Sequence, residues 1–450
     1  MTDAPSMRKL FRMWWPLAAS WLLMSFEGPA IALVLARLAH PEISLAAYGG
    51  LILPLCFLIE APVVMLLSAS TALSRDSQSY RVMRRFMHGL SAGLTLLHAV
   101  VAFTPVYYLV ARGLIGAPEE IIEPSRIGMM LTLPWTWAIA YRRFNQGVLI
   151  RSGLSLAVGT GTMVRLSTEL AVLGTAWIVG TIPGAAVAAA TLCLGVVAEA
   201  FYAKFRVGPV RKELPIPPPG TPPLTQRGLL SFYIPLSLTS VLLFAANPLV
   251  SAAVSRMPEA ISSLAVWPVV NSVSFIVRSF GVGFSEVVIA VIERPGAVRQ
   301  LRRFGIVISA VSFAVFAVLA MPPLATPIYG TVVGLKPELV SLLAKYPWLL
   351  APLPLLAVAQ SYCQGAILHG RRTRSVTEAV FVFLFATSAM LVAGVLWGGV
   401  VGLPVGMAAL VLGETLRTGW LWLRSRAIRR ELWSSSQPTT LGSDASYPVL

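Results

Sequence analysis

The stretch Trp14–Arg37, WWPLAASWLLMSFEGPAIALVLAR, returns later in the chain as YIPLSLTSVLLFAANPLVSAAVSR at Tyr233–Arg256. One constant offset pairs Pro16 with Pro235, Pro29 with Pro248 and Arg37 with Arg256. Each copy can cross a bilayer, because about 20 apolar residues at 1.5 Å per residue span the hydrocarbon core. The repeat therefore predicts a membrane protein built from two related halves.

The composition supports this class. The chain has 450 residues, of which 56% are hydrophobic and 12% charged. A soluble domain carries about 25% charged residues, so a water-facing surface of normal size is excluded. The net charge of +16 would suggest nucleic acid in a soluble protein. The basic loops hold no aromatic residues that could stack on bases, so we expect a lipid bilayer as the partner and no nucleic acid.

We predict twelve transmembrane helices, at residues 14–36, 46–70, 86–111, 127–150, 156–180, 184–204, 229–254, 261–292, 304–326, 338–368, 376–398 and 402–424. The second, eighth and tenth are longer than one crossing requires, so we expect them to tilt or bend. Most Lys and Arg residues fall in alternate loops and the two termini. The positive-inside rule then places both termini in the cytoplasm, with the protein in the plasma (inner) membrane.

These spans divide the chain into a leader (1–13), an N-lobe (14–204), a Pro-rich linker (205–228), a C-lobe (229–424) and a cytoplasmic tail (425–450). The run LPIPPPGTPPLTQ at Leu214–Gln226 favours extended polyproline II, and the polar tail from Ser434 is predicted to be disordered. Each lobe has six spans, so the lobes share one orientation and are related by a pseudo-twofold axis along the membrane normal. Transporters built in this way bind their substrate between the lobes near the bilayer midplane.

Two carboxylates lie at mid-depth in the first lobe. Glu27 is in the middle of the first span, before Gly28 and Pro29, and Glu60 is in the middle of the second. Ionisable groups at this depth are usually functional. If the two are close, they cannot both ionise cheaply, so we predict that they share a proton or Na⁺. Alternatively, each bonds a neighbouring hydroxyl or a backbone carbonyl freed at the Gly28-Pro29 break.

The second lobe differs at the equivalent positions. Asn247 replaces Gly28, and Ser279, with Arg278 beside it, replaces Glu60. Because guanidinium groups bind carboxylate or phosphate with two hydrogen bonds, Arg278 is the candidate anion ligand. The predicted substrate site comprises Arg278, Asn247, Ser279 and Glu286. The alternative is an Arg278–Glu286 ion pair within the lobe.

Other intramembrane charges have simpler interpretations. Arg165 and Glu169, spaced i,i+4, and Glu414 and Arg417, spaced i,i+3, are predicted ion pairs. Arg142 and Arg143 lie near the cytoplasmic end of the fourth span. They serve either as topology signals or as the lining of a cytoplasmic mouth that attracts anions.

No catalytic motif is present. The four His residues lack metal-ligand spacing, and there is no phosphate-binding glycine loop. The three Cys residues all fall within predicted spans, where they read as small core residues. We therefore predict a protein that is not an enzyme, that carries no cofactor or metal, and that works as a monomer driven by ion or substrate gradients.

Several stretches resemble the progressive ankylosis (ANK) family: Leu45–Arg75 with Asp76 following, Gly147–Gly159, Leu230–Leu236, and Gly402–Thr415 with its G-E-T. That family is grouped with the multidrug/oligosaccharidyl-lipid/polysaccharide transporters, whose MATE-like fold has twelve helices in two V-shaped lobes. The resemblance implies an exporter, and ANK members are associated with release of anions such as pyrophosphate, ATP or citrate.

The resulting hypothesis is a secondary-active, alternating-access transporter that exports a small organic or phosphorylated anion. Two alternatives within the superfamily are a flippase for lipid-linked oligosaccharide and a cationic multidrug exporter. A non-transporting membrane scaffold is the third. An arginine-lined site favours anions, a glutamate-dominated site favours cations, and a groove open to lipid favours the flippase.

Overall fold

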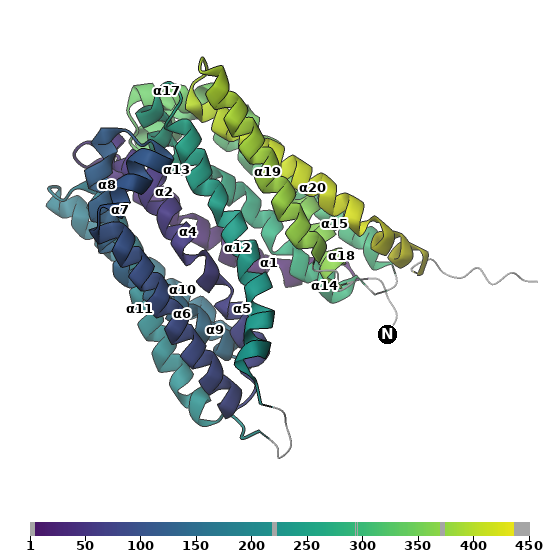
Figure 1. The fold of residues 1–450 in the computed structure, drawn as a ribbon. Coiled ribbons are helices and arrows are strands. Elements are labelled where there is room, and N and C mark those ends of the chain that lie inside the picture. Colours follow the sequence, from purple (N-terminus) through teal and green to yellow (C-terminus); the bar gives the residue numbers. More distant parts are fainter. Residues whose placement is uncertain (1–4, 218–222, 293, 295, 370–373, 436–450) are drawn as a thin grey trace, which may run out of the picture.

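The computed structural model describes residues 5–217, 223–292, 294, 296–369 and 374–435, and within these ranges the chain forms helices and no strands (Figure 1). The middle of the Pro-rich linker and the tail beyond Ser435 lie outside the described residues. On either side of that gap, residues 214–217 and 223–225 are non-helical, as their proline content predicts.

The elements of the first half are α1 (Met7–Ser25), α2 (Glu27–Leu35), α3 (Pro41–Ala47), the π-helix η1 (Tyr48–Ile52), α4 (Leu53–Val64), α5 (Leu66–Leu73), α6 (Ser77–Phe103), α7 (Val106–Tyr108), the π-helix η2 (Leu109–Ile115), α8 (Glu119–Leu131), α9 (Leu133–Arg151), α10 (Ser155–Val179) and α11 (Gly184–Lys212).

Those of the second half are α12 (Gln226–Val254), α13 (Ala260–Val282), α14 (Phe284–Val291), α15 (Ala297–Ala320), α16 (Pro322–Ala325), the π-helix η3 (Thr326–Val332), α17 (Pro337–Lys345), the 3₁₀-helix η4 (Pro347–Leu350), α18 (Leu353–His369), α19 (Arg374–Trp397) and α20 (Gly402–Ser435).

Side-chain caps fix the starts of three long helices. The Ser6 hydroxyl accepts from the backbone of Lys9 at the start of α1, and Thr225 accepts from Gly228 at the start of α12. Asp76 begins α6 with a capping box, in which its carboxylate accepts from Ser79 N while the Ser79 hydroxyl accepts from Asp76 N. Such caps satisfy backbone donors that have no partner within the helix. The described chain therefore becomes helical from Met7, inside the predicted leader.

The structure is that of an all-α multi-pass membrane protein. Among the described residues, nine helices or near-continuous helix pairs are long and apolar enough to span a bilayer, and ten if α17 and the helix after it, which meet at 49°, count as one bent span. The predicted spans at 127–150 and 402–424 do not qualify. The first contains Arg142, which pairs with Glu199 of α11. The second contains Glu414 and Arg417, which pair with each other. The predicted count of twelve is thus not confirmed.

The two halves repeat their unusual backbone conformations. His40 (φ 51°) and Glu259 (φ 56°) are left-handed residues that immediately precede α3 and α13, and they are equivalent at the offset that relates the two copies of the repeat. Left-handed glycines recur at an offset one residue shorter, at Gly116 and Gly334, and at Gly180 and Gly398. Non-glycine residues rarely adopt this conformation, so these matches show that the halves follow the same path.

The expected bends in the long spans are present. The helix of the second predicted span breaks at Met65, between α4 and α5, where ψ is −3°. The helix of the eighth breaks at Gly283, between α13 and α14, also with ψ of −3°. The two breaks occupy equivalent places in the repeat.

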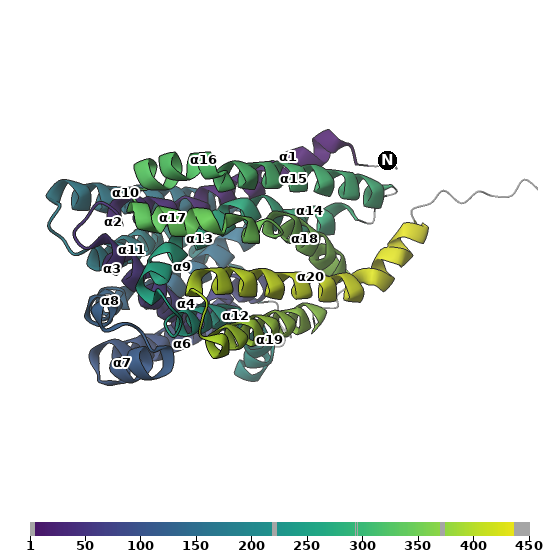
Figure 2. The same ribbon diagram turned by 90° about the horizontal axis from the view of Figure 1, so that it is seen from above.

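The first helix of each half packs against the other half, which the predicted lobe boundaries did not anticipate. Helix α1 contacts α13, α14 and α15, and α12 contacts α4; Figure 2 shows α1 lying along α15. The Trp14 indole donates to the carbonyl of Phe280 (2.9 Å), and the hydroxyl of Tyr233 donates to that of Pro62 (2.5 Å). Trp14 and Tyr233 are equivalent in the repeat, so these two contacts are reciprocal.

A second reciprocal pair of contacts joins the halves through arginine. Arg37 donates to the carbonyls of Thr331, Val332 and Val333 at the end of η3, over 2.6–2.8 Å. Arg256 donates to those of Gly113, Leu114 and Ile115 at the end of η2, over 2.5–3.4 Å. The last carbonyls of a helix lack partners within it, and here the guanidinium groups supply them. We call these contacts the Arg37 clasp and the Arg256 clasp.

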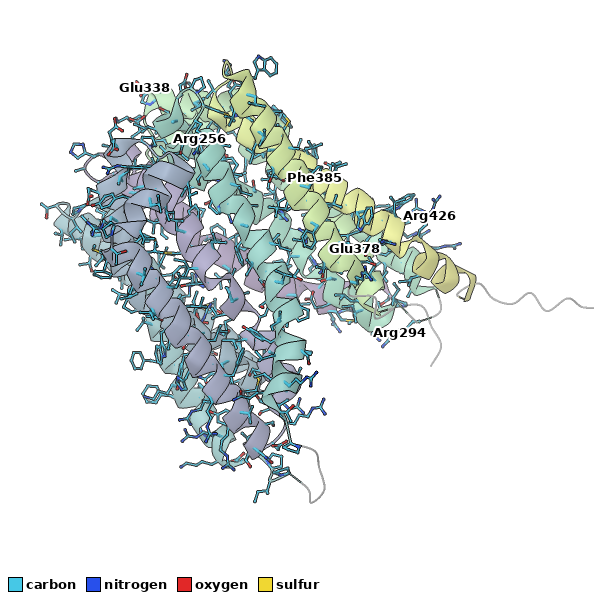
Figure 3. All side chains as sticks on the ribbon, viewed as in Figure 1. Arg256, Arg294, Glu338, Glu378, Phe385 and Arg426 are labelled. Atoms are coloured by element: carbon cyan, nitrogen blue, oxygen red, sulfur yellow. The ribbon has the colours of Figure 1, made fainter. Side chains whose placement is uncertain are left out.

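Both clasps lie at the end of the molecule where the halves converge. Helices α8 and α17 meet α2 and α13 there, and towards the other end α5 and α11 diverge from α14 and α18 (Figure 1). Figure 3 shows Arg256 and Glu338 at the converged end, and Arg294, Glu378 and Arg426 at the opposite end of the second half. An ion pair between Glu42 and Lys336 (3.4 Å) also joins the halves at the converged end.

Candidate transport site

Glu27 is the first residue of α2, directly after the break at Phe26 that separates α2 from α1. Its carboxylate is ion-paired with Arg165 of α10, and Arg165 Nε also donates to Glu169 Oε1 over 2.7 Å. The predicted Arg165–Glu169 pair is therefore confirmed, with Glu27 as an additional member. The exposed fractions of the Glu27, Arg165 and Glu169 side chains are only 15%, 10% and 3%. Together the three groups carry a formal charge of −1, which is largely shielded from solvent.

Glu60, on α4, is in a different environment. It is 1% exposed, and neither carboxylate oxygen has a hydrogen-bond partner within the described part of the chain. Thr136 of α9 lies beside it, and the Thr136 hydroxyl is 2.7 Å from His98 Nδ1. An ionised carboxyl group without a hydrogen-bond partner is very costly to bury.

A third cluster connects α9 to α11. Glu199 accepts hydrogen bonds from Arg142 and from the amide of Gln146, the latter at 2.8 Å. Arg142 is 5% exposed, so its guanidinium group is committed to Glu199 rather than to solvent. Arg143 is partly exposed, and its buried Nε has no hydrogen-bond partner within the described residues.

The second half has an arginine-rich counterpart. Glu414 of α20 accepts from Arg278 of α13 at 2.7 Å and from Gln360 of α18 at 2.7 Å. Arg417 contacts the same carboxylate at 3.5 Å, which confirms the predicted i,i+3 pair. Two guanidinium groups thus share one carboxylate, and the cluster has a formal charge of +1. Of its charged side chains, Arg278 is the most exposed, at 26%.

The Glu199 and Glu414 clusters follow one plan. In each, a glutamate on the last long helix of the half accepts from a side chain on α9 or the equivalent α18. Arg142 and Gln360 occupy equivalent positions, at the offset that pairs Gln146-Gly147 with Gln364-Gly365. Both halves therefore have a buried glutamate acceptor in this cluster, but the arginines that contact it come from different helices in the two halves.

The structure separates residues that the sequence grouped. Glu27 pairs with Arg165, and Glu60 has no hydrogen bond within the described residues, so no short contact joins the two glutamates. Arg278 pairs with Glu414 and not with Glu286, which is exposed and accepts from Ser285. The proposed Arg278–Glu286 pair is therefore wrong.

The other two predicted substrate ligands are less favourably placed. Ser279 is fully buried, and its hydroxyl donates to the carbonyl of Ile276 on its own helix. Asn247 is half-buried on α12, and its backbone carbonyl accepts from Ser251. These bonds lie within single helices and do not join either residue to the Arg278 cluster. Among the residues described, no group of three or more His, Cys, Asp or Glu could hold a metal ion.

Sequence reasoning missed two members of these clusters. The contact between Arg165 and Glu27 bridges 138 residues and leaves no local signal. Gln360 could have been found, because it aligns with Arg142 at the offset that also aligns Gln146-Gly147 with Gln364-Gly365. Because a polar residue lies at this position in both halves, Gln360 could have been predicted as a member of the cluster.

Comparison with known proteins adds a fold-level relationship. No family model matches the chain, and no curated protein matches it in sequence. The resemblance to the ANK family therefore stays a prediction.

Solved structures do match over nearly the whole chain. An inward-facing multidrug resistance MATE transporter of the MOP superfamily matches with a TM-score of 0.65 at 16% identity, covering 92% of this chain and 96% of that one. The lipid II flippase MurJ, in an inward closed conformation, matches with a TM-score of 0.68 at 13% identity, covering 93% and 90%. A Pyrococcus furiosus MOP superfamily transporter, described as having a binding pocket of reversed polarity, matches with 0.58 at 15%, covering 96% and 97%.

These identities establish the fold alone. The chain has the fold of MOP superfamily transporters, proteins that are not enzymes, and it is a multi-pass membrane protein.

Proposed function

We propose that this protein is a secondary-active, alternating-access transporter that exports a small organic or phosphorylated anion. The observation that carries the anion assignment is the Arg278 cluster, in which two guanidinium groups share one buried carboxylate and the more exposed one, Arg278, still faces partly outward. A carboxylate or phosphate group would complete the charge balance of this cluster. Arginine suits both groups because its planar fork forms two parallel hydrogen bonds.

The coupling site in this proposal is Glu60. A proton needs only one acceptor, and neither oxygen of this buried carboxyl group has a hydrogen-bond partner within the described residues, although Thr136 and the Arg142 guanidinium are near it. Glu27, which the sequence predicted as a second coupling residue, would instead stay bound to Arg165. The proton and the anion would then bind in different halves. The ion gradient could therefore drive substrate transport only through a conformational change that involves both halves.

The reciprocal contacts between the halves support alternating access. The clasps hold the halves together at one end, and at the other end the halves diverge. If the positive-inside prediction is correct, the diverged end carries the basic loops and both termini and faces the cytoplasm of an inner membrane. The structure would then be an inward-facing state with Arg143 near its mouth. In this proposal all twelve predicted segments lie in the membrane, and the monomer is the working unit.

Substitution of Arg278 tests the anion assignment. Loss of a charge-assisted contact in a desolvated site costs about 2–5 kcal/mol, which is tens to thousands of fold in affinity. We expect Arg278→Ala to lose binding of inorganic pyrophosphate or citrate by this order. Arg278→Lys should be intermediate, because it keeps the charge but loses the fork. Glu414 keeps Arg417 and Gln360 in both variants, so folding should persist.

The measurement is equilibrium binding to purified protein, with Arg424→Ala as control. Arg424 lies on α20, the helix of Glu414, and pairs with a different acidic residue, Glu378 (2.7 Å), away from the Arg278 cluster. Unchanged anion affinity in folded Arg278→Ala would show that this arginine serves the fold, and the anion proposal would fail.

A flippase for lipid-linked oligosaccharide is the second candidate, favoured by the match to the lipid II flippase. The negative Glu27 cluster is what a cationic drug exporter would use. Proteoliposomes loaded in turn with pyrophosphate, a fluorescent lipid-linked sugar or a cationic dye separate the three. A protein that moves none of them under an imposed proton gradient would be a scaffold.

A further inference from the structure

The first half contains a cavity outside the charged clusters described above. It has a volume of about 510 Å³ and lies between α6, α9 and α11. These helices pack mainly against others of the first half, and in Figure 1 α6 and α11 form the flank that lies away from α18, α19 and α20. In a membrane this flank faces lipid, not the space between the halves.

The polar lining of the cavity is basic. Arg84 of α6 and Lys204 and Arg211 of α11 line it, and none of its lining residues is acidic. Arg84 lies two turns from the start of α6, and Arg211 is in the last turn of α11. The N-terminal end of α6 and the C-terminal end of α11 lie at the diverged end of the molecule, so in a membrane we expect the three cations near the phospholipid headgroups.

A buried amide also lines the cavity. Asn145 of α9 is 1% exposed, and its Nδ2 has no hydrogen-bond partner within the described residues. An unpaired buried donor costs free energy, and such groups are rare in folded proteins. A ligand oxygen at this position would supply the missing acceptor.

The rest of the lining is aromatic and apolar. Trp137 and Tyr141 of α9 stack with ring centroids 4.9 Å apart, and Phe201 and Phe205 of α11 are 54% and 75% exposed. An apolar wall that runs from a cationic rim towards the bilayer centre fits an amphiphile whose anionic headgroup stays at the rim.

We propose that this cavity binds one anionic phospholipid, with its phosphate at Arg84, Lys204 and Arg211, a headgroup or ester oxygen at Asn145, and its acyl chains along the aromatic wall. Charge complementarity selects the occupant, because a zwitterionic lipid brings its own cation to a rim that already has three. The lipid would bridge α6, α9 and α11 and so stabilise the first half, independently of any transported substrate.

Two charge-matched variants test the proposal. In Arg84→Gln/Lys204→Gln/Arg211→Gln the lining cations are removed. In Arg85→Gln/Arg206→Gln/Lys212→Gln, neighbouring cations on the same helices that do not line the cavity are removed. Each is reconstituted in phosphatidylcholine nanodiscs with and without phosphatidylglycerol, and lipid binding is measured by native mass spectrometry and thermal stability.

Each basic group near an anionic headgroup contributes about fivefold in affinity. We therefore expect the lining variant to lose about a hundredfold in phosphatidylglycerol affinity, and the control variant to change little. Equal losses in both would indicate a general surface-charge effect and overturn the proposal. If inorganic phosphate or glycerol phosphate competes with the lipid at equal affinity, the site binds a free anion and the lipid assignment is wrong.

Asn145→Leu provides a second test if the triple variant does not fold. The substitution removes an unpaired buried donor, so stability in pure phosphatidylcholine should be retained. The affinity for phosphatidylglycerol should fall by about fivefold, as expected for the loss of one hydrogen bond between neutral groups worth about 1 kcal/mol. An unchanged affinity in the folded Asn145→Leu protein would show that no lipid oxygen meets this amide, and the proposal would fail.

Discussion

At the residue scale, the two halves differ in the sign of the buried charge that is not fully balanced. Glu60 has no hydrogen-bond partner in the described residues, and the equivalent Ser279 bonds its own helix. Next to it, Arg278 is one of two arginines on one glutamate. In the proposed function the first half gains a proton and the second half gains an anion, and each change improves the charge balance.

We expect Glu60→Gln to uncouple transport from the proton gradient and to leave the fold intact. Glutamine has the same shape, and it replaces a carboxyl group that has no ion-pair partner in the described chain. The melting temperature should be unchanged or slightly raised, since no buried charge remains to be neutralised. Transport should keep its substrate affinity but lose its dependence on an imposed pH gradient.

The assay is substrate flux into proteoliposomes at several pH gradients, beside thermal unfolding of the same preparation. Glu338→Gln, at the exposed converged end, is the control. A Glu60→Gln protein that responds to the gradient like wild type would assign coupling to another group, with the Glu27 cluster next in line.

Sequence reasoning reached part of this site. Local spacing was enough to predict Arg165–Glu169 and Glu414–Arg417, because residues three or four apart share a helix face. It could not show that Arg165 reaches Glu27 or that Arg278 reaches Glu414, since these contacts depend on how distant helices pack. The depth of a charge can be read from a sequence, but its partner on another helix cannot.

At the element scale, the length of the second and eighth spans predicted that they bend, and the structure shows breaks at Met65 and Gly283. It did not predict that α1 and α12 would each pack on the opposite half. The hydropathy pattern of a helix is similar whether its apolar neighbours belong to its own half or to the other half. A single sequence therefore does not show on which half the first helix of each repeat packs. Polar helices such as α20 also have hydropathies too low for a simple span count.

The clasps depend on two glycines. Gly116 (φ 69°) and Gly334 (φ 86°) follow η2 and η3, and a Cβ at either would lie 3.2 Å or 2.7 Å from the Arg256 or Arg37 guanidinium. Gly153 (φ 78°) is a matched control, because it has the same handedness and nothing within 4 Å. Alanine at any of the three costs about 1–2 kcal/mol in backbone strain.

We expect only Gly116→Ala and Gly334→Ala to displace a clasp as well, and so to open the converged end. Spin labels at Glu120 and Glu338, one in each half, would report this as a longer distance in double electron–electron resonance. Equal distance distributions in all three variants would mean that the clasps do not control opening.

At the scale of the whole molecule, two sets of contacts between the halves come in equivalent pairs. Trp14 and Tyr233 form one pair, and Arg37 and Arg256 the other. The acceptors in both pairs are backbone carbonyls, which no substitution removes. The two halves should therefore recognise each other without the peptide link at residues 218–222.

We expect residues 1–217 and 223–450, produced as separate chains in one cell, to assemble into a complex that binds anion like the intact protein. Copurification through a tag on one chain, followed by the binding assay, is the measurement. Assembly should be lost when Arg37, Arg256, Trp14 and Tyr233 are all replaced by alanine. If the unaltered chains do not copurify, the linker is required for association.

The reciprocity of these contacts has a consequence for ancestry. A chain of half this length would meet its own copy through the same surface patch on both subunits, which is an isologous interface, and would close as a symmetric homodimer. In such a dimer every side chain occurs twice, so a proton acceptor on one wall would necessarily stand on the other as well. Only after fusion into one polypeptide could one half keep a glutamate at position 60 while the other acquired serine at position 279 beside an arginine. Fusion would thus have allowed the two halves to acquire different residues and different functions, which is impossible in a homodimer.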